Sequence, residues 1–161
     1  MAATDAGPLV TLPSETEIMI TRDFAAPRHL VYRAWTTPEL IARWWHAKRG
    51  TITSIEVDLR QGGAWRYAMT ANAGFEVAFH GEYLEIVPGE RIVSTEVYEG
   101  APDAAAVSTV TFAAIGGGGT RLSILVEHGS KDNRDMHVRS GMEDGLRDAL
   151  DLLAEVAAAG A

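Results

Sequence analysis

The ordered part of the chain opens with an alternation of apolar and polar side chains. Apolar residues recur at even spacing across residues 17–24, with Arg22 as the exception, which predicts a strand with one buried face. Two short helices are expected next, one beginning near Pro27 and one at Thr37-Pro38-Glu39. Proline is tolerated in the first turn of a helix, and a hydroxyl or a carboxylate favours a helix start.

Short strand-like runs separated by turn residues fill residues 51–128. Because the breaks between them are short, each strand is expected to pair with its neighbour in an antiparallel meander. The breaks divide this region into six strands, and they fall at Gly62-Gly63, Asn72-Ala73-Gly74, Pro88-Gly89, Gly100-Ala101-Pro102-Asp103 and residues 116–119.

Helical spacing returns over roughly residues 132–158. One face of this segment collects apolar side chains, which predicts a long amphipathic helix: Met142, Leu146, Ala149, Leu150, Leu153 and Val156. Gly141 and Gly145 lie one turn apart and would allow its backbone to approach the sheet closely. The pattern therefore predicts an α+β fold, in which a curved seven-stranded antiparallel sheet wraps around the C-terminal helix and two short helices lie between strands 1 and 2. We expect a flexible N-terminus over residues 1–14 and a single domain over residues 15–161.

Composition narrows the classes of function. The 161-residue chain has no cysteine, which excludes disulfides, thiolate metal sites and thiol catalysis. Its formal net charge of −8 disfavours nucleic acid and anionic membranes as partners. No apolar run is long enough to cross a bilayer and no signal peptide precedes the domain, so we expect a cytoplasmic protein.

Four segments of the chain carry a resemblance to a known family: residues 24–45, 57–67, 81–88 and 141–146. They resemble the activator of Hsp90 ATPase homologues, a family within the START-like or SRPBCC superfamily. The resemblance implies the helix-grip fold of START domains and birch-pollen allergens, with a cavity for a small hydrophobic ligand between the sheet and the last helix. The eukaryotic co-chaperones of this family carry a separate N-terminal domain, and this chain has no room for one. We therefore do not expect Hsp90 as a partner. We expect no cofactor.

The candidate ligand contacts are apolar residues with two histidines. Trp65 and Tyr67 alternate onto one strand face, and a Trp44-Trp45 pair follows the short helices. The predicted walls are Trp44, Trp65, Tyr67, Phe79, Met142 and Leu146, and His80 or His128 is the predicted polar contact. Ordinary core packing explains the same residues, so both interpretations stay open.

Three hypotheses for function follow. The first is binding of a small hydrophobic ligand in the cavity. The second is an enzyme similar to polyketide cyclases or aromatases with a cavity histidine as general base, although no hydrolase or metalloprotease motif is present. The third is a protein-interaction module, either a chaperone accessory or a homodimer, that uses an apolar patch on the outer face of the sheet. We expect no metal at His80, Glu82 and His128, since their spacing does not bring three ligands together.

Overall fold

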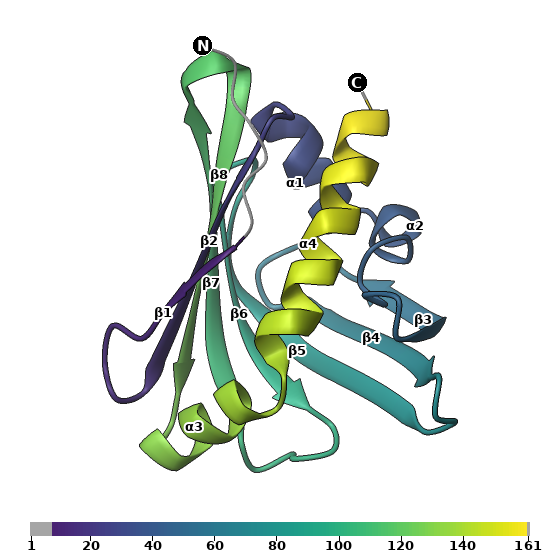
Figure 1. Ribbon diagram of the computed structural model, residues 1–161, viewed down its shortest axis with the longest axis vertical. Coiled ribbons are helices and arrows are strands. Elements are labelled where there is room, and N and C mark those ends of the chain that lie inside the picture. Colours follow the sequence, from purple (N-terminus) through teal and green to yellow (C-terminus); the bar gives the residue numbers. More distant parts are fainter. Residues whose placement is uncertain (1–7, 161) are drawn as a thin grey trace.

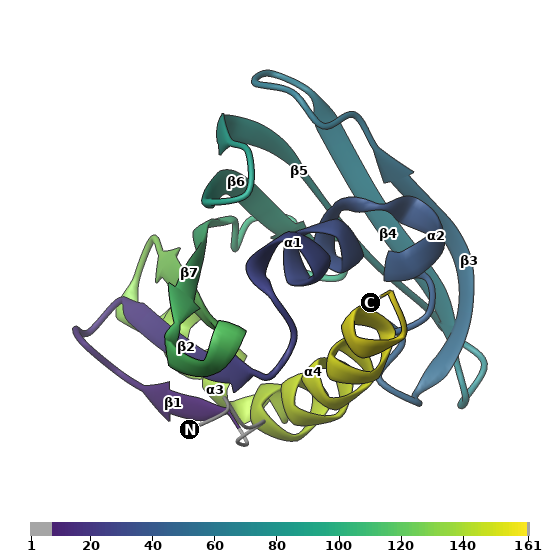
Figure 2. The same cartoon turned by 90° about the horizontal axis from the view of Figure 1, so that it is seen from above.

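The computed structural model describes residues 8–160, which form a strongly curved antiparallel sheet with helices on its concave side (Figures 1 and 2). The elements in chain order are β1 (Leu9–Thr11), β2 (Glu17–Phe24), α1 (Arg28–Thr36), α2 (Pro38–Ile41), β3 (Gly50–Val57), β4 (Ala64–Ala71), β5 (Glu76–Val87), β6 (Arg91–Tyr98), β7 (Ala106–Ile115), a 3-10 turn (Gly116–Gly118), β8 (Gly119–His128), α3 (Lys131–Arg139) and α4 (Met142–Ala159).

The sheet has eight strands in the order β1-β2-β8-β7-β6-β5-β4-β3, and every neighbouring pair is antiparallel. The six strands expected between residues 51 and 128 form a meander, as predicted, and β2 returns to pair with β8. The eighth strand is β1, whose Val10 pairs with Ile20. The expectation of a flexible segment over residues 1–14 therefore needs correction at Leu9–Thr11, and residues 1–7 lie outside the described part.

Strand β2 has one buried face, as its alternating sequence predicted. Ile18, Ile20 and Phe24 are buried on its inner face, and Arg22 shares that face. The guanidinium carbon of Arg22 lies 5.1 Å from the centre of the Phe24 ring, within the range of a cation–π contact. Arg22 is thus a buried cation on an otherwise apolar strand face.

The C-terminal helix is broken where a single helix was expected. Ser130 caps α3 by accepting a hydrogen bond from the backbone N–H of Asn133, and α3 ends at Arg139. Gly141 has a φ of +84°, in the left-handed region that favours glycine, and α4 begins at the next residue. Gly145 does not approach the sheet, because a Cβ added there would meet only Arg49 Nε, at 4.0 Å. The expected close approach at these glycines is therefore not observed.

Helix α4 closes the opening of the curved sheet and is tied to both of its sides (Figure 2). Leu150 and Leu153 are fully buried in the core. Asp151 pairs with Arg22 of β2 at 2.6 Å, and Asp148 pairs with Arg49, which directly precedes β3, at 2.7 Å. Within residues 8–160 no helix is long and apolar enough to cross a membrane.

Candidate functional site

Five aromatic side chains form a continuous series on the concave side of the sheet. We call Trp65, Tyr67, Trp45, Phe79 and Tyr98 the aromatic row. Ring centres are 4.8 Å apart between Trp65 and Tyr67 and 5.6 Å apart between Tyr67 and Trp45. Trp45 lies 5.8 Å from Phe79, and Phe79 lies 5.0 Å from Tyr98. The row therefore runs from β4 to β6 through mutual ring contacts.

Strand register explains why these rings meet. Tyr67 pairs with Phe79 across β4 and β5, and Phe79 pairs with Tyr98 across β5 and β6. Trp65 pairs with Gly81, where an added Cβ would lie 2.7 Å from Trp65 Nε1 and 1.9 Å from the backbone oxygen of Thr95. The missing side chain at Gly81 leaves room for the indole. Trp45 is supplied by the turn after α2, beyond the strands.

Two of the predicted wall residues lie at the beginning of α4. Met142 and Leu146, which are four residues apart on this helix, are partly buried and pack against the core. Trp45, Tyr67 and Phe79 are also only partly buried, and Tyr98 is 40% exposed. Four of the predicted contacts are therefore only partly buried: Tyr67, Phe79, Met142 and Leu146.

Three polar groups on this side of the sheet have perturbed acidity. Desolvation raises the pKa of Glu96, although the residue is only partly buried. The pKa of Tyr67 is raised well above its ordinary value, first by burial, then by the Tyr83 hydroxyl and the charge of Glu96. Burial also raises the pKa of Tyr83 to about 12. Glu96 and Tyr67 therefore combine reduced hydration with residual solvent contact.

Glu96 reaches the inner face through the alternation of β6. Its neighbours on that face, Ser94 and Ile92, are buried, and Ser94 pairs with the core residue Tyr83. On its other side Glu96 pairs with Ala106, a small buried residue of β7. Within residues 8–160 no hydrogen bond or ion pair joins the Glu96 carboxyl group to another side chain.

Trp65 carries an unsatisfied donor. The residue is 8% exposed, and its Nε1 is buried without a hydrogen-bond partner among the described residues. An unpaired buried donor costs about 1–3 kcal/mol. At this end of the row, the indole N–H of Trp65 therefore has no hydrogen-bond acceptor among the described residues.

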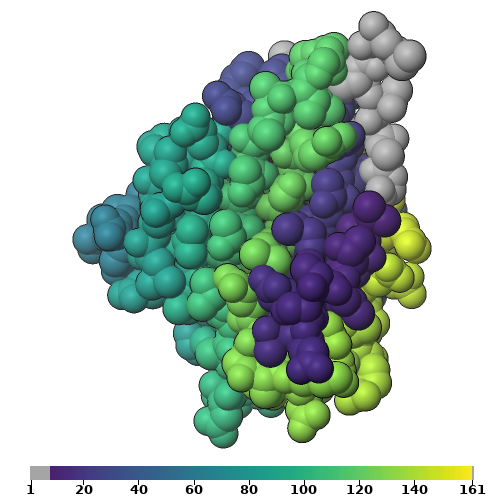
Figure 3. Space-filling view, turned by 90° about the vertical axis from the view of Figure 1, so that its left-hand side faces the viewer, coloured from purple at the N-terminus to yellow at the C-terminus, as the bar shows by residue number. Residues whose placement is uncertain are grey.

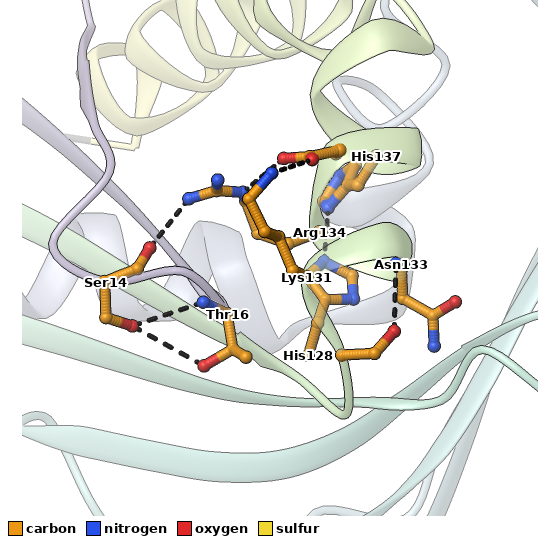
Figure 4. A network of polar contacts seen from close by, with 9 residues as sticks. Ser14, Thr16, His128, Lys131, Asn133, Arg134 and His137 are labelled. Atoms are coloured by element: carbon orange, nitrogen blue, oxygen red, sulfur yellow. Dashed lines mark hydrogen bonds and ion pairs between the residues drawn. The ribbon is translucent and has the colours of Figure 1, made fainter.

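The predicted polar contact His128 belongs to a different cluster, at the junction of β8 and α3 (Figure 4). Its Nε2 lies 3.0 Å from Nδ1 of His137, and its Nδ1 is buried without a partner among residues 8–160. Burial, with a smaller effect of Arg134, lowers the pKa of His128. Burial and then His128 lower the pKa of His137 to about 4. Both imidazoles are thus held neutral near pH 7.

The other histidine candidate, His80, lies on the opposite face of the sheet from Phe79 and is exposed. Its Nδ1 lies 2.9 Å from Glu99, which also accepts a hydrogen bond from Arg66 Nε at 2.8 Å. The Arg66 guanidinium first, and then His80, lower the pKa of Glu99 to about 2. The prediction that His80 contacts a ligand beside Phe79 is therefore corrected by the strand register. Figure 3 shows the molecule from the side of β1 (purple), which is the first strand in the sheet order.

Trp44 also lies away from the row. It is 4% exposed, it stacks on Trp35 at 5.0 Å, and its Nε1 donates a hydrogen bond of 2.9 Å to the backbone oxygen of Ala34. These contacts make Trp44 a satisfied core residue between α1 and the turn after α2. The neighbouring Trp45 is the indole that contacts Tyr67 and Phe79.

Sequence reasoning missed Tyr98 and Glu96 as candidate residues, and of the Trp44-Trp45 pair it chose Trp44 as the wall residue. Tyr98 and Glu96 are separated by one residue on β6, and that spacing was a usable signal for a shared face. The choice between Trp44 and Trp45 had no such signal, because the turn after α2 is irregular, with positive φ values at Ala47 and Lys48.

Two pockets lie elsewhere on the molecule, and neither is lined by a predicted site residue. One, of about 160 Å³, lies between α1, α2 and the end of α4 and includes Leu30 and Val156. The other, of about 390 Å³, is a shallow depression beside Arg22 and Asp151. Among residues 8–160 no group of three or more His, Cys, Asp or Glu side chains is arranged to hold a metal ion.

The sequence matches the model of a protein family described as activator of Hsp90 ATPase homolog 1-like protein, over residues 25–158. This match spans most of the chain, from the residue after β2 to the last turn of α4. The chain belongs to this family.

Solved structures agree with the activator of Hsp90 ATPase homolog 1-like fold. A protein of Chromobacterium violaceum is 33% identical, with 89% of this chain and 98% of that chain covered and a TM-score of 0.77. A protein of Nitrosomonas europaea is 26% identical, with coverages of 92% and 98% and a TM-score of 0.82. A Rhodobacter sphaeroides protein, 24% identical over 94% and 99%, shares the fold with a TM-score of 0.87. A search of proteins with curated functions returned no match.

Proposed function

We propose that the protein binds a small, largely apolar molecule against the aromatic row, between the inner face of β4–β6 and the beginning of α4. The observation that carries the proposal is the row itself, in which aromatic rings that contact one another remain partly exposed. Aromatic surfaces with a few polar groups are typical of small-molecule sites.

The acidity of Glu96 and Tyr67 supports a recess at this place. Desolvation raises both pKa values, and yet both residues are only partly buried. A group on an open surface would be hydrated, and a group in a filled core would have no accessible atoms. A group at the base of an indentation is poorly hydrated and still keeps some accessible atoms. Met142 and Leu146 would contact the ligand from the helix side.

The alternative of a histidine-dependent enzyme has less support. His80 lies on the outer face, and His128 Nε2 is engaged by His137 while its Nδ1 is enclosed. A general base needs an accessible nitrogen within reach of the substrate. A protein-docking patch also has little support, because exposed apolar residues such as Leu9, Phe75 and Met136 come from different elements.

A titration with Nile red, a neutral apolar fluorophore, tests the proposal. The wild-type protein is expected to give a saturable fluorescence increase that apolar and aromatic compounds reverse by competition. Phe79→Ala should weaken Nile red binding at least tenfold, because it removes the central ring of the row.

Phe75→Ala is the matched control. Phe75 lies in the turn before β5, is 57% exposed and takes no part in the row, so its loss should leave binding unchanged. The absence of saturable binding, or equal effects of the two substitutions, would refute binding at the row.

A further inference from the structure

Glu96 is a carboxyl group with no compensating charge in its surroundings. Among the described residues no Arg, Lys or His forms an ion pair with it, whereas Glu99, three residues later, is paired with both Arg66 and His80 on the outer face. Burial raises the pKa of Glu96 through desolvation. A charge-bearing group set this deep normally has a partner.

Strand register places aromatic residues on the same face of the sheet as Glu96. The charge of Glu96 also contributes to the raised pKa of Tyr67. Tyr98 lies on the same face of β6, two residues away, and stacks with Phe79. Aromatic faces attract cations, and a bound cation would supply the counter-charge that Glu96 lacks. The formal net charge of −8 also attracts cations to the protein.

We infer that the ligand of the aromatic row is an amine, with an apolar body against Tyr67, Phe79 and Tyr98 and an ammonium group paired with the Glu96 carboxylate. This inference rests on the proposed binding site and adds the chemical class of the ligand. Aromatic rings with a single carboxylate distinguish a cation from a neutral molecule of the same shape, because only the cation gains from both.

Three probes with one hydrocarbon body test the inference: 4-phenylbutylamine, 4-phenylbutan-1-ol and 4-phenylbutyrate, each titrated by calorimetry at pH 7.5. The wild-type protein should bind the amine at least tenfold more tightly than the alcohol, and the carboxylate more weakly than either. Glu96→Gln should remove the preference for the amine while it preserves binding of the alcohol.

Glu82→Gln is the control, since Glu82 is an exposed carboxylate of β5 on the outer face. It should keep the preference for the amine. Equal binding of amine and alcohol by the wild-type protein would overturn the inference and leave the proposed binding site standing. Failure of both probes to bind, and of Nile red to bind, would refute the site itself. The wild-type ratio decides the question even where Glu96→Gln does not fold.

Discussion

The imidazoles of His128 and His137 meet edge to face, with Nε2 of His128 3.0 Å from Nδ1 of His137. This contact joins the end of β8 to α3, and Arg134 of α3 lies beside it (Figure 4). A hydrogen bond between the two rings requires that at least one of the two facing nitrogens carry no proton. Protonation of both would place two cations in contact next to the guanidinium of Arg134.

Stability should therefore fall with acidification between about pH 6.5 and pH 4. Burial lowers the pKa of His137 from 6.5 to about 4 in the folded state, so the unfolded chain binds more protons in this interval. The stability contributed by the neutral pair is present above pH 6.5 and is lost as the pH falls toward 4. Urea titrations across this range should show a loss of about 2 kcal/mol from His137, discounted for its partial exposure.

His137→Gln should flatten this pH dependence, whereas His29→Gln, at an exposed position of α1, should leave it unchanged. An identical slope in the His137 variant and the wild type between pH 4 and 6.5 would contradict the role assigned to the pair.

Asp151→Asn should destabilise the protein by about 1–3 kcal/mol. The substitution leaves the Arg22 guanidinium, whose side chain is only 4% exposed, without its carboxylate partner. The 54% exposure of Asp151 keeps the cost below that of a fully buried pair. Urea unfolding would measure the effect. Asp144→Asn removes an exposed contact with Arg147 and should cost less than about 0.5 kcal/mol. Equal effects of the two substitutions would show that Asp151 does not anchor α4 to β2.

Alanine substitutions at Gly141, before α4, and at Gly145, inside α4, should act in opposite directions. Gly145→Ala should stabilise the protein by up to about 1 kcal/mol, since the position is helical and a Cβ meets only Arg49 Nε at 4.0 Å. Gly141→Ala should destabilise it by about 1 kcal/mol, because its φ of +84° is unfavourable for alanine. Thermal and urea unfolding would measure both. If Gly145→Ala were destabilised instead, the result would favour the close approach to the sheet that the sequence predicted.

Most of the fold could be predicted from local sequence patterns. The even spacing of Ile18, Ile20 and Phe24 corresponds to the buried face of β2, and the Pro88-Gly89 turn separates β5 from β6 as expected. The break at Gly141 was not predicted, because the apolar positions after it continue a helical spacing and a single glycine costs a helix only about 1 kcal/mol.

The site was less accessible from the sequence. Trp65, Tyr67 and Phe79 meet because strand alternation and register bring them together. His80 was misplaced because its alternate neighbours, Ala78 and Glu82, do not identify a buried face in sequence. Trp44 and Trp45 lie in an irregular turn that orients their side chains differently. Two adjacent tryptophans give no sign in the sequence of which one contacts the row. Glu96 shows its unusual environment only when the neighbouring strands are in place.

Ligand binding at the aromatic row is tested most directly by the indole N–H signals of the four tryptophans in an NMR titration with 4-phenylbutan-1-ol. Trp45 and Trp65 belong to the row, whereas Trp35 and Trp44 stack on each other in the core beside α1. We predict saturable shifts of the Trp45 and Trp65 signals, with those of Trp35 and Trp44 unchanged. Shifts confined to Trp35 and Trp44, or no shift at millimolar concentrations of the alcohol, would contradict binding at the row.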